Sequence, residues 1–130
     1  MKIENIKFKA KRLDNGQWVS GDLVHTLDGK LYILGSVGEE GRMAFSEAYQ
    51  INSATVCQFT GIRDRESNEI YEGDILKGDL KCEIVYTKGT FSTFCIGYDK
   101  REYSYPLCYF VREDGTVDGK VVGNKFDKEK

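Results

Sequence analysis

Residues 70–76 read Ile-Tyr-Glu-Gly-Asp-Ile-Leu. Apolar residues lie on both sides of a glycine–aspartate pair. Glycine permits a sharp bend, and an aspartate side chain accepts hydrogen bonds from backbone N–H groups two residues further on. The stretch therefore predicts a tight corner between two short strands. Residues 18–24, Trp-Val-Ser-Gly-Asp-Leu-Val, carry the same pair, so we expect the same device there; an internal duplication is one explanation.

The composition of the whole chain favours strands over helices. Of its 130 residues, 40% are hydrophobic and 12% aromatic, with 14 glycines and one proline. β-branched and aromatic side chains fit a pleated surface and lose rotamer freedom in a helix. We predict an all-β fold, in which residues 43–51 are the only stretch with helical character. Pro106 lacks an N–H and should lie on an edge strand or at a bulge.

Charged residues along the chain are nearly balanced. The 19 Lys and Arg against 21 Asp and Glu give a formal net charge of −2, whereas nucleic-acid and membrane binders rely on clustered cations. Apolar residues alternate with lysines between Ile6 and Lys11, which predicts an edge strand with a solvated lysine face. No apolar run approaches the roughly 18 residues of a membrane helix, and no secretory signal precedes the first strand. We therefore expect a cytoplasmic protein without membrane contact.

The cysteines do not have the spacing of a metal site. No two of them form a C-x-x-C pair, and His25, the only histidine, is far from all of them in the sequence. We expect reduced thiols that act as small hydrophobic residues in strands, with no metal and no cofactor. These cysteines are Cys57, Cys82, Cys95 and Cys108.

Acidic residues gather in one polar stretch. Such a cluster is able to bind a divalent cation or to supply a general acid and base. No histidine lies nearby in the sequence, neighbouring arginines neutralise part of the charge, and the chain has no nucleophile elbow or phosphate-binding glycine pattern. We expect solvated carboxylates and no catalytic residues, so a small metal-assisted hydrolase is the least favoured function. The cluster comprises Asp64, Glu66, Glu69, Glu72 and Asp74.

Aromatic and basic residues gather in residues 91–112. Small β-barrels bind single-stranded nucleic acids or peptides by stacking them on exposed aromatic rings beside lysine or arginine. Alternating aromatic residues also fill the interior of a small barrel and its subunit contacts, and we favour that interpretation. The candidate interaction surface comprises Tyr98, Lys100, Arg101, Tyr103, Tyr105, Tyr109 and Arg112.

Three stretches, residues 6–23, 58–75 and 121–124, resemble the YopX family of bacteriophage and prophage proteins. Their order and spacing cover nearly the whole chain, and the corner at residues 70–75 is the most specific part. The resemblance implies an SH3-like β-barrel at residues 55–127, packed with a smaller β-rich part at residues 1–54, and we expect a frayed tail at 128–130. It also implies a phage or mobile-element origin in a bacterial cytoplasm. It supplies no activity and no catalytic residue.

The function expected from these observations is a non-enzymatic binding or interaction module. Its partner is expected to be a protein, either a host or phage protein or a second copy of the chain, so a homo-oligomer is one of the expected forms. The alternative is a barrel that binds single-stranded nucleic acid. We disfavour that alternative because the release of counterions from a nucleic acid requires several aligned cations.

Overall fold

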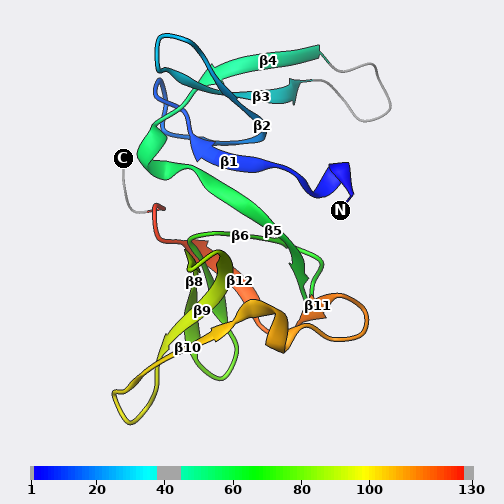
Figure 1. Cartoon of the computed structure of the whole chain (residues 1–130), viewed down its shortest axis with the longest axis vertical. Coiled ribbons are helices and arrows are strands. Elements are labelled where there is room, and N and C mark those ends of the chain that lie inside the picture. The colour runs from blue at the N-terminus through cyan, green and yellow to red at the C-terminus, as the bar shows by residue number, and fades with distance from the viewer. Residues whose placement is uncertain (1, 38–44, 128–130) are drawn as a thin grey trace. The chain divides into compact units, whose positions relative to one another are not determined.

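The computed structural model describes residues 2–37 and 45–127, and strands dominate them (Figure 1). This confirms the all-β prediction, whereas the expected tail at residues 128–130 lies outside the described residues. Within the described part, no helix is long and apolar enough to cross a membrane. The chain divides into two compact units, Met1–Gln58 and Phe59–Lys130. The domain boundary expected between residues 54 and 55, and the SH3-like barrel, stay predictions.

The first unit is built around an antiparallel sheet. Its order is β5-β1-β2-β3-β4, with only the first two residues of β5 taking part. Ala10, Ile33 and Ile51 form its buried core. The elements are η1 (Ile3–Asn5), β1 (Phe8–Lys11), β2 (Trp18–His25), β3 (Leu31–Val37), β4 (Phe45–Gln50), η2 (Ser53–Thr55) and β5 (Cys57–Asp64).

Strand β1 pairs on both sides, with β2 and with β5, so the prediction of an edge strand is wrong. The lysines of this strand have a different role from the expected one. The ammonium groups of Lys9 and Lys11 lie 4.9 and 5.7 Å from the centroid of the Trp18 ring. A cation is attracted to the face of an indole ring, and the aliphatic stems of lysine cover apolar surface. A lysine stripe therefore fits an interior strand when an aromatic ring lies beside it.

The glycine–aspartate pair at residues 18–24 does not form the expected corner. Strand β2 continues through it, and Asp22 is exposed. Gly21 has a φ of 154°, and a Cβ there would overlap the carbonyl oxygen of Leu34 and lie 2.9 Å from its carbonyl carbon. This glycine is required by the close approach of β3 and not by a bend. The two stretches therefore share a sequence pattern but not the same backbone structure.

Residues 45–50 form strand β4 and not the expected helical turn. Each of its residues lies opposite a residue of β3, from Tyr32↔Gln50 to Val37↔Phe45. Cross-strand pairing outweighs a weak local preference for helix, because strand stability depends on neighbours. Met43 and Ala44 lie outside the described residues.

The second unit contains a five-stranded antiparallel sheet with the order β10-β9-β8-β7-β12. The rest of β5 lies in this unit and pairs with β6 and β11. Pro106 lies on the edge strand β10, as its missing N–H predicts. The elements are β6 (Glu69–Tyr71), β7 (Asp74–Lys77), β8 (Lys81–Thr87), β9 (Thr90–Ile96), β10 (Glu102–Pro106), η3 (Leu107–Phe110), β11 (Thr116–Val117) and β12 (Lys120–Asn124). Its buried core comprises Ile70, Leu76, Ile84, Leu107 and Val117.

The corner predicted at residues 70–76 is present between β6 and β7, with a φ of 84° at Gly73. Its aspartate works differently from the prediction. The Asp74 carboxylate is fully buried and accepts hydrogen bonds from the backbone N–H of Tyr71, 2.8 Å away, and from Nδ2 of Asn124, 2.9 Å away. It therefore bonds an amide three residues earlier and a side chain of β12.

A second fully buried carboxylate, that of Asp64, holds the other end of β12. It accepts hydrogen bonds from the backbone N–H groups of Glu66, Asn68 and Val121, each 2.9 Å away. Burial raises the pKa of Asp64, but these hydrogen bonds and one from the Asn68 side chain outweigh it and hold the pKa below its usual value. Strand β12 is thus fastened by one buried aspartate at each end.

We expect Gly21→Ala to destabilise the first unit by roughly 3 kcal/mol or more, because the methyl group overlaps the backbone of β3. Gly29→Ala is the control: Gly29 also has a positive φ, of 84°, but no atom lies within 4 Å of its Cβ position. Backbone strain alone should cost about 1 kcal/mol there. Denaturant unfolding followed by the fluorescence of Trp18, the only tryptophan of the chain, measures both changes. Equal losses in the two variants would contradict the steric argument.

We expect Asp64→Asn to destabilise the second unit by about 1–3 kcal/mol near pH 6, because an amide lacks one of the acceptor oxygens. The folded-state pKa of Asp64 is depressed, so its contribution is present above the unfolded pKa of about 3.9 and is lost as pH falls through the folded pKa. The difference in the free energy of unfolding between wild type and variant should therefore decrease as the pH falls from about 5 to about 2. Urea unfolding followed by the near-ultraviolet circular dichroism of tyrosine measures this difference. A difference that stays constant with pH would contradict the proposed role of the Asp64 carboxylate.

Candidate ligand-binding site

A cavity of about 490 Å³ opens on one face of the five-stranded sheet. Leu76, Cys82, Cys95 and Tyr103 are successive cross-strand partners on β7, β8, β9 and β10. Residues directly opposite each other in a sheet project from the same face. Because Leu76 belongs to the buried core, this row continues the core face of the sheet into the cavity.

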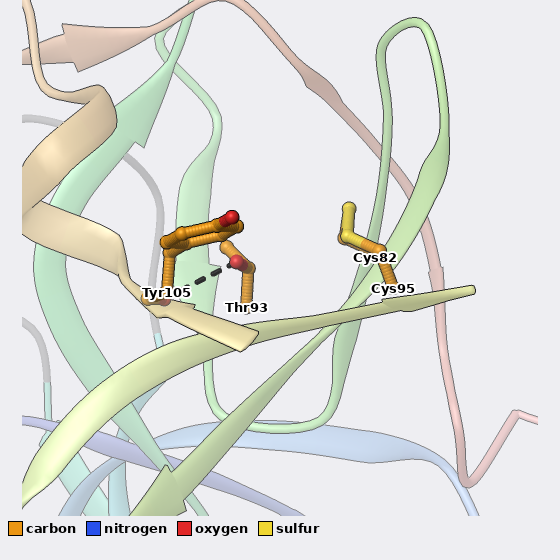
Figure 2. Close-up of a disulfide and its surroundings, with 4 residues drawn as sticks. All are labelled: Cys82, Thr93, Cys95 and Tyr105. Atoms are coloured by element: carbon orange, nitrogen blue, oxygen red, sulfur yellow. Dashed lines mark hydrogen bonds between the residues drawn. A yellow bond between two sulfur atoms is a disulfide. The ribbon is translucent and has the colours of Figure 1, made fainter. Parts of the chain in front are cut away.

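The next row on the same face contains Thr93 and Tyr105, which lie opposite each other on β9 and β10. The Thr93 hydroxyl donates a hydrogen bond to the carbonyl oxygen of Tyr105, 3.2 Å away. Figure 2 shows the Tyr105 ring, the Thr93 side chain and the Cys82–Cys95 disulfide on the same side of these strands. The remaining walls come from η3, β11 and two turns, and they comprise Leu107, Phe110, Val117, Gly78, Asp79, Leu80, Asp118 and Gly119.

Cys82 and Cys95 form a disulfide across β8 and β9, so the prediction of reduced thiols is wrong for this pair. Their Cα atoms lie 4.5 Å apart, a separation typical of the closer type of antiparallel pair, whose side chains are near enough to bridge. Lys88 and Gly89 both have positive φ, as a type I′ hairpin turn requires. The two cysteines lie equally far from this turn, and the prediction from the sequence missed that symmetry, which is the signal for a bridge between paired strands. Among the described residues, Cys57 and Cys108 take part in no disulfide.

The tyrosines of the candidate surface are largely exposed. The exposed fractions are 88% for Tyr98, 47% for Tyr105 and 73% for Tyr109, while Tyr103 is half-buried. The favoured interpretation placed these rings in a barrel interior and in subunit contacts. Its first part is wrong for Tyr98, Tyr105 and Tyr109, and its second part stays a prediction. The outward-facing rings follow from the position of β10 at the sheet edge and from the exposure of η3. Tyr103 and Tyr105 line the cavity, together with Phe110, which was outside the predicted set.

The basic residues of the candidate surface do not line the cavity. Arg101 lies 3.9 Å from a carboxylate oxygen of Asp99, and Arg112 lies 2.9 Å from one of Asp118. Lys100 is exposed in the turn between β9 and β10, where its φ is 63°. Of the predicted surface, Tyr103 and Tyr105 therefore line the cavity, whereas Arg101 and Arg112 are paired with acidic neighbours outside its lining.

Hydrogen bonds from two tyrosines shape the rim of the cavity. The Tyr103 hydroxyl donates to the Asp99 carboxylate, 2.6 Å away, which lowers the pKa of Asp99 and raises the pKa of Tyr103. The Tyr98 hydroxyl donates to the carbonyl oxygen of Asp79, 3.1 Å away. This second bond connects the β9–β10 turn to the β7–β8 turn, which forms part of the cavity wall.

The acidic residues at 64–74 do not converge on a common site. Asp64 and Asp74 are buried and bonded to backbone or amide groups, as described above. Glu66 pairs with Lys120 at 3.3 Å, and Glu69 pairs with Arg63 at 3.5 Å. In the part of the chain that the structure describes, no group of three or more His, Cys, Asp or Glu residues is arranged to hold a metal ion. His25 is exposed on β2.

We expect the double variant Cys82→Ala/Cys95→Ala to lose up to roughly 3 kcal/mol of stability, because the bridge closes a loop of about 14 residues in the unfolded chain. Thiol titration of the denatured wild type should find two free thiols, those of Cys57 and Cys108. Dithiothreitol should lower the urea midpoint of the wild type and leave that of the double variant unchanged. Four free thiols in protein kept without reductant would contradict the bridge.

A comparison with family models identifies the family of the chain. The model described as YopX protein matches residues 7–128, a range that includes every residue of the cavity. No curated protein matches the chain. Since the match covers nearly the whole sequence, the resemblance in the three stretches is confirmed, and the chain belongs to the YopX family.

Proposed function

We propose that the protein is a non-enzymatic binding module whose second unit takes an apolar side chain of a partner protein into its cavity. Family membership names no activity, so the cavity itself is the observation that carries the proposal. Its volume of about 490 Å³ falls within the usual range of ligand sites, which are concave, mostly apolar and equipped with a few polar groups.

The chemistry of the walls favours an apolar group. Leucine, valine and aromatic side chains and the disulfide make up most of the surface, and the Thr93 hydroxyl already donates to a backbone carbonyl. Full burial of one leucine or phenylalanine side chain contributes about 1.5–3 kcal/mol. The exposed rings of Tyr105 and Phe110, with centroids 6.3 Å apart, supply further contact area at the rim.

The charges around the cavity favour a protein partner over nucleic acid. The exposed tyrosines would serve as a stacking platform, which is the observation in favour of the alternative. However, Arg101 and Arg112 face acidic neighbours, and binding to phosphates depends on cations that displace counterions. We further propose a phage or prophage origin and a bacterial cytoplasmic setting, with a host or phage protein as the partner.

Selection from a displayed library of short random peptides, with the full chain immobilised, tests this function. We expect convergent peptides with an apolar residue whose binding weakens by about tenfold in Phe110→Ala, the loss typical of a contact worth about 1.4 kcal/mol. Tyr109→Ala is the matched control, since Tyr109 is also exposed on η3 but does not line the cavity. It should change affinity by less than about twofold.

Two outcomes would contradict the proposal. One is a set of peptides that bind wild type and Phe110→Ala equally. The other is binding of oligothymidine that falls steeply with salt and is lost in Arg101→Ala, which would support the nucleic-acid alternative instead. Sedimentation of the free chain shows whether a second copy already occupies the cavity.

A further inference from the structure

We propose that the cavity selects an apolar side chain that lies beside a positive charge, so that the partner segment carries a lysine or arginine next to its apolar anchor. This inference deepens the proposed function and rests on it. Among the residues that the structure describes, Asp79 and Asp118 are the charged ones that line the cavity, and no lysine or arginine does so. The net charge of the lining is therefore negative, which complements a cationic segment.

The two carboxylates come from turns that lie side by side. Asp79 is in the turn between β7 and β8, and Asp118 is in the turn between β11 and β12. A Cβ placed on Gly78 would lie 3.9 Å from Cα of Gly119, so the two turns are separated by about the width of one methyl group. Both acidic residues consequently lie at the same part of the rim.

Aromatic rings at the same cavity also favour a cation. Tyr103, Tyr105 and Phe110 line it, and the face of an aromatic ring carries negative potential that attracts ammonium and guanidinium groups. The Tyr103 hydroxyl donates to the carboxylate of Asp99, a third negative charge close to the rings that Arg101, 3.9 Å away, partly offsets. An aliphatic stem with a charged end, as in lysine, contacts both kinds of surface.

Basic residues nearby reduce this negative charge. Arg112 lies 2.9 Å from Asp118, and Lys120 is paired with Glu66. Arg65, Lys77 and Lys120 line a neighbouring hollow that also includes Asp79 and Asp118. Because Asp118 already faces Arg112, we assign the larger share of the selectivity to Asp79. An exposed pair of this kind changes affinity by up to about fivefold.

Three probes of matched size and different charge test the inference: 2-phenylethylamine, 2-phenylethanol and 3-phenylpropionate. Each is titrated into the full chain while the amide signals of Thr93, Tyr105 and Phe110 are followed by NMR. We expect the cation to bind about three- to fivefold more tightly than the alcohol, and the carboxylate to bind most weakly. Added salt should reduce the difference between the probes.

Charge-removing variants show whether the preference comes from the cavity rim. Asp79→Asn should bring the affinity of 2-phenylethylamine close to that of 2-phenylethanol measured on the same variant. Asp114→Asn is the matched control, because Asp114 is exposed and lies near Arg112 but does not line the cavity. It should preserve the preference for the cation.

The outcomes separate this inference from the proposed function. Equal affinities for all three probes, with shifts at the cavity signals, would overturn the charge preference and leave the apolar site in place. A preference that persists in Asp79→Asn/Asp118→Asn would overturn its assignment to the rim. Absence of shifts at the cavity signals with every probe would overturn both proposals.

Discussion

The second unit depends on two buried carboxylates that fasten β12. A buried polar group destabilises a fold unless its hydrogen bonds are satisfied, and a charged one does so more strongly. Asp64 and Asp74 meet this requirement by binding Val121 and Asn124 of β12, together with amides of their own turns. The residues just before β12, from Val117 to Gly119, line the cavity. The position of that wall therefore follows from the same hydrogen bonds that complete the sheet.

The parts of the fold that were predictable from the sequence are those determined by local chemistry. Strand-forming composition predicted the all-β class, and glycine conformation predicted the corner at residues 70–76. The failures concern partners distant in sequence. Residues 43–51 had a weak helical pattern, but every residue of β4 lies opposite a residue of β3. Gly21 is followed by aspartate, as Gly73 is. However, glycine is required at position 21 because the backbone of Leu34 lies close to it, and no local sequence pattern reveals that neighbour.

The candidate site was predictable only in its aromatic half. Residues 98–112 were identified because aromatic rings cluster there, and a cluster is visible along the chain. The cavity is formed by residues 76–119, which come together only through the pairing of β7 to β10 and the return of η3 and β11. Arg101 pairs with Asp99, two residues away, and Arg112 pairs with Asp118, six residues away. These arginines are therefore less available to bind a phosphate group than the sequence suggested. The numbers of acidic and basic residues in a sequence do not show which charges form salt bridges.

The fastening of β12 also constrains how the second unit assembles. Asp74 and Asn124 are 50 residues apart in sequence, and Asp64 and Val121 are 57 apart. Contacts between such distant residues form late and slow folding, because a long loop must close first. During synthesis on the ribosome, the hairpins between them emerge before their fastening strand exists. A nascent chain that stops short of β12 would keep both aspartates hydrated and its sheet edge open, and it would be a natural substrate for chaperones.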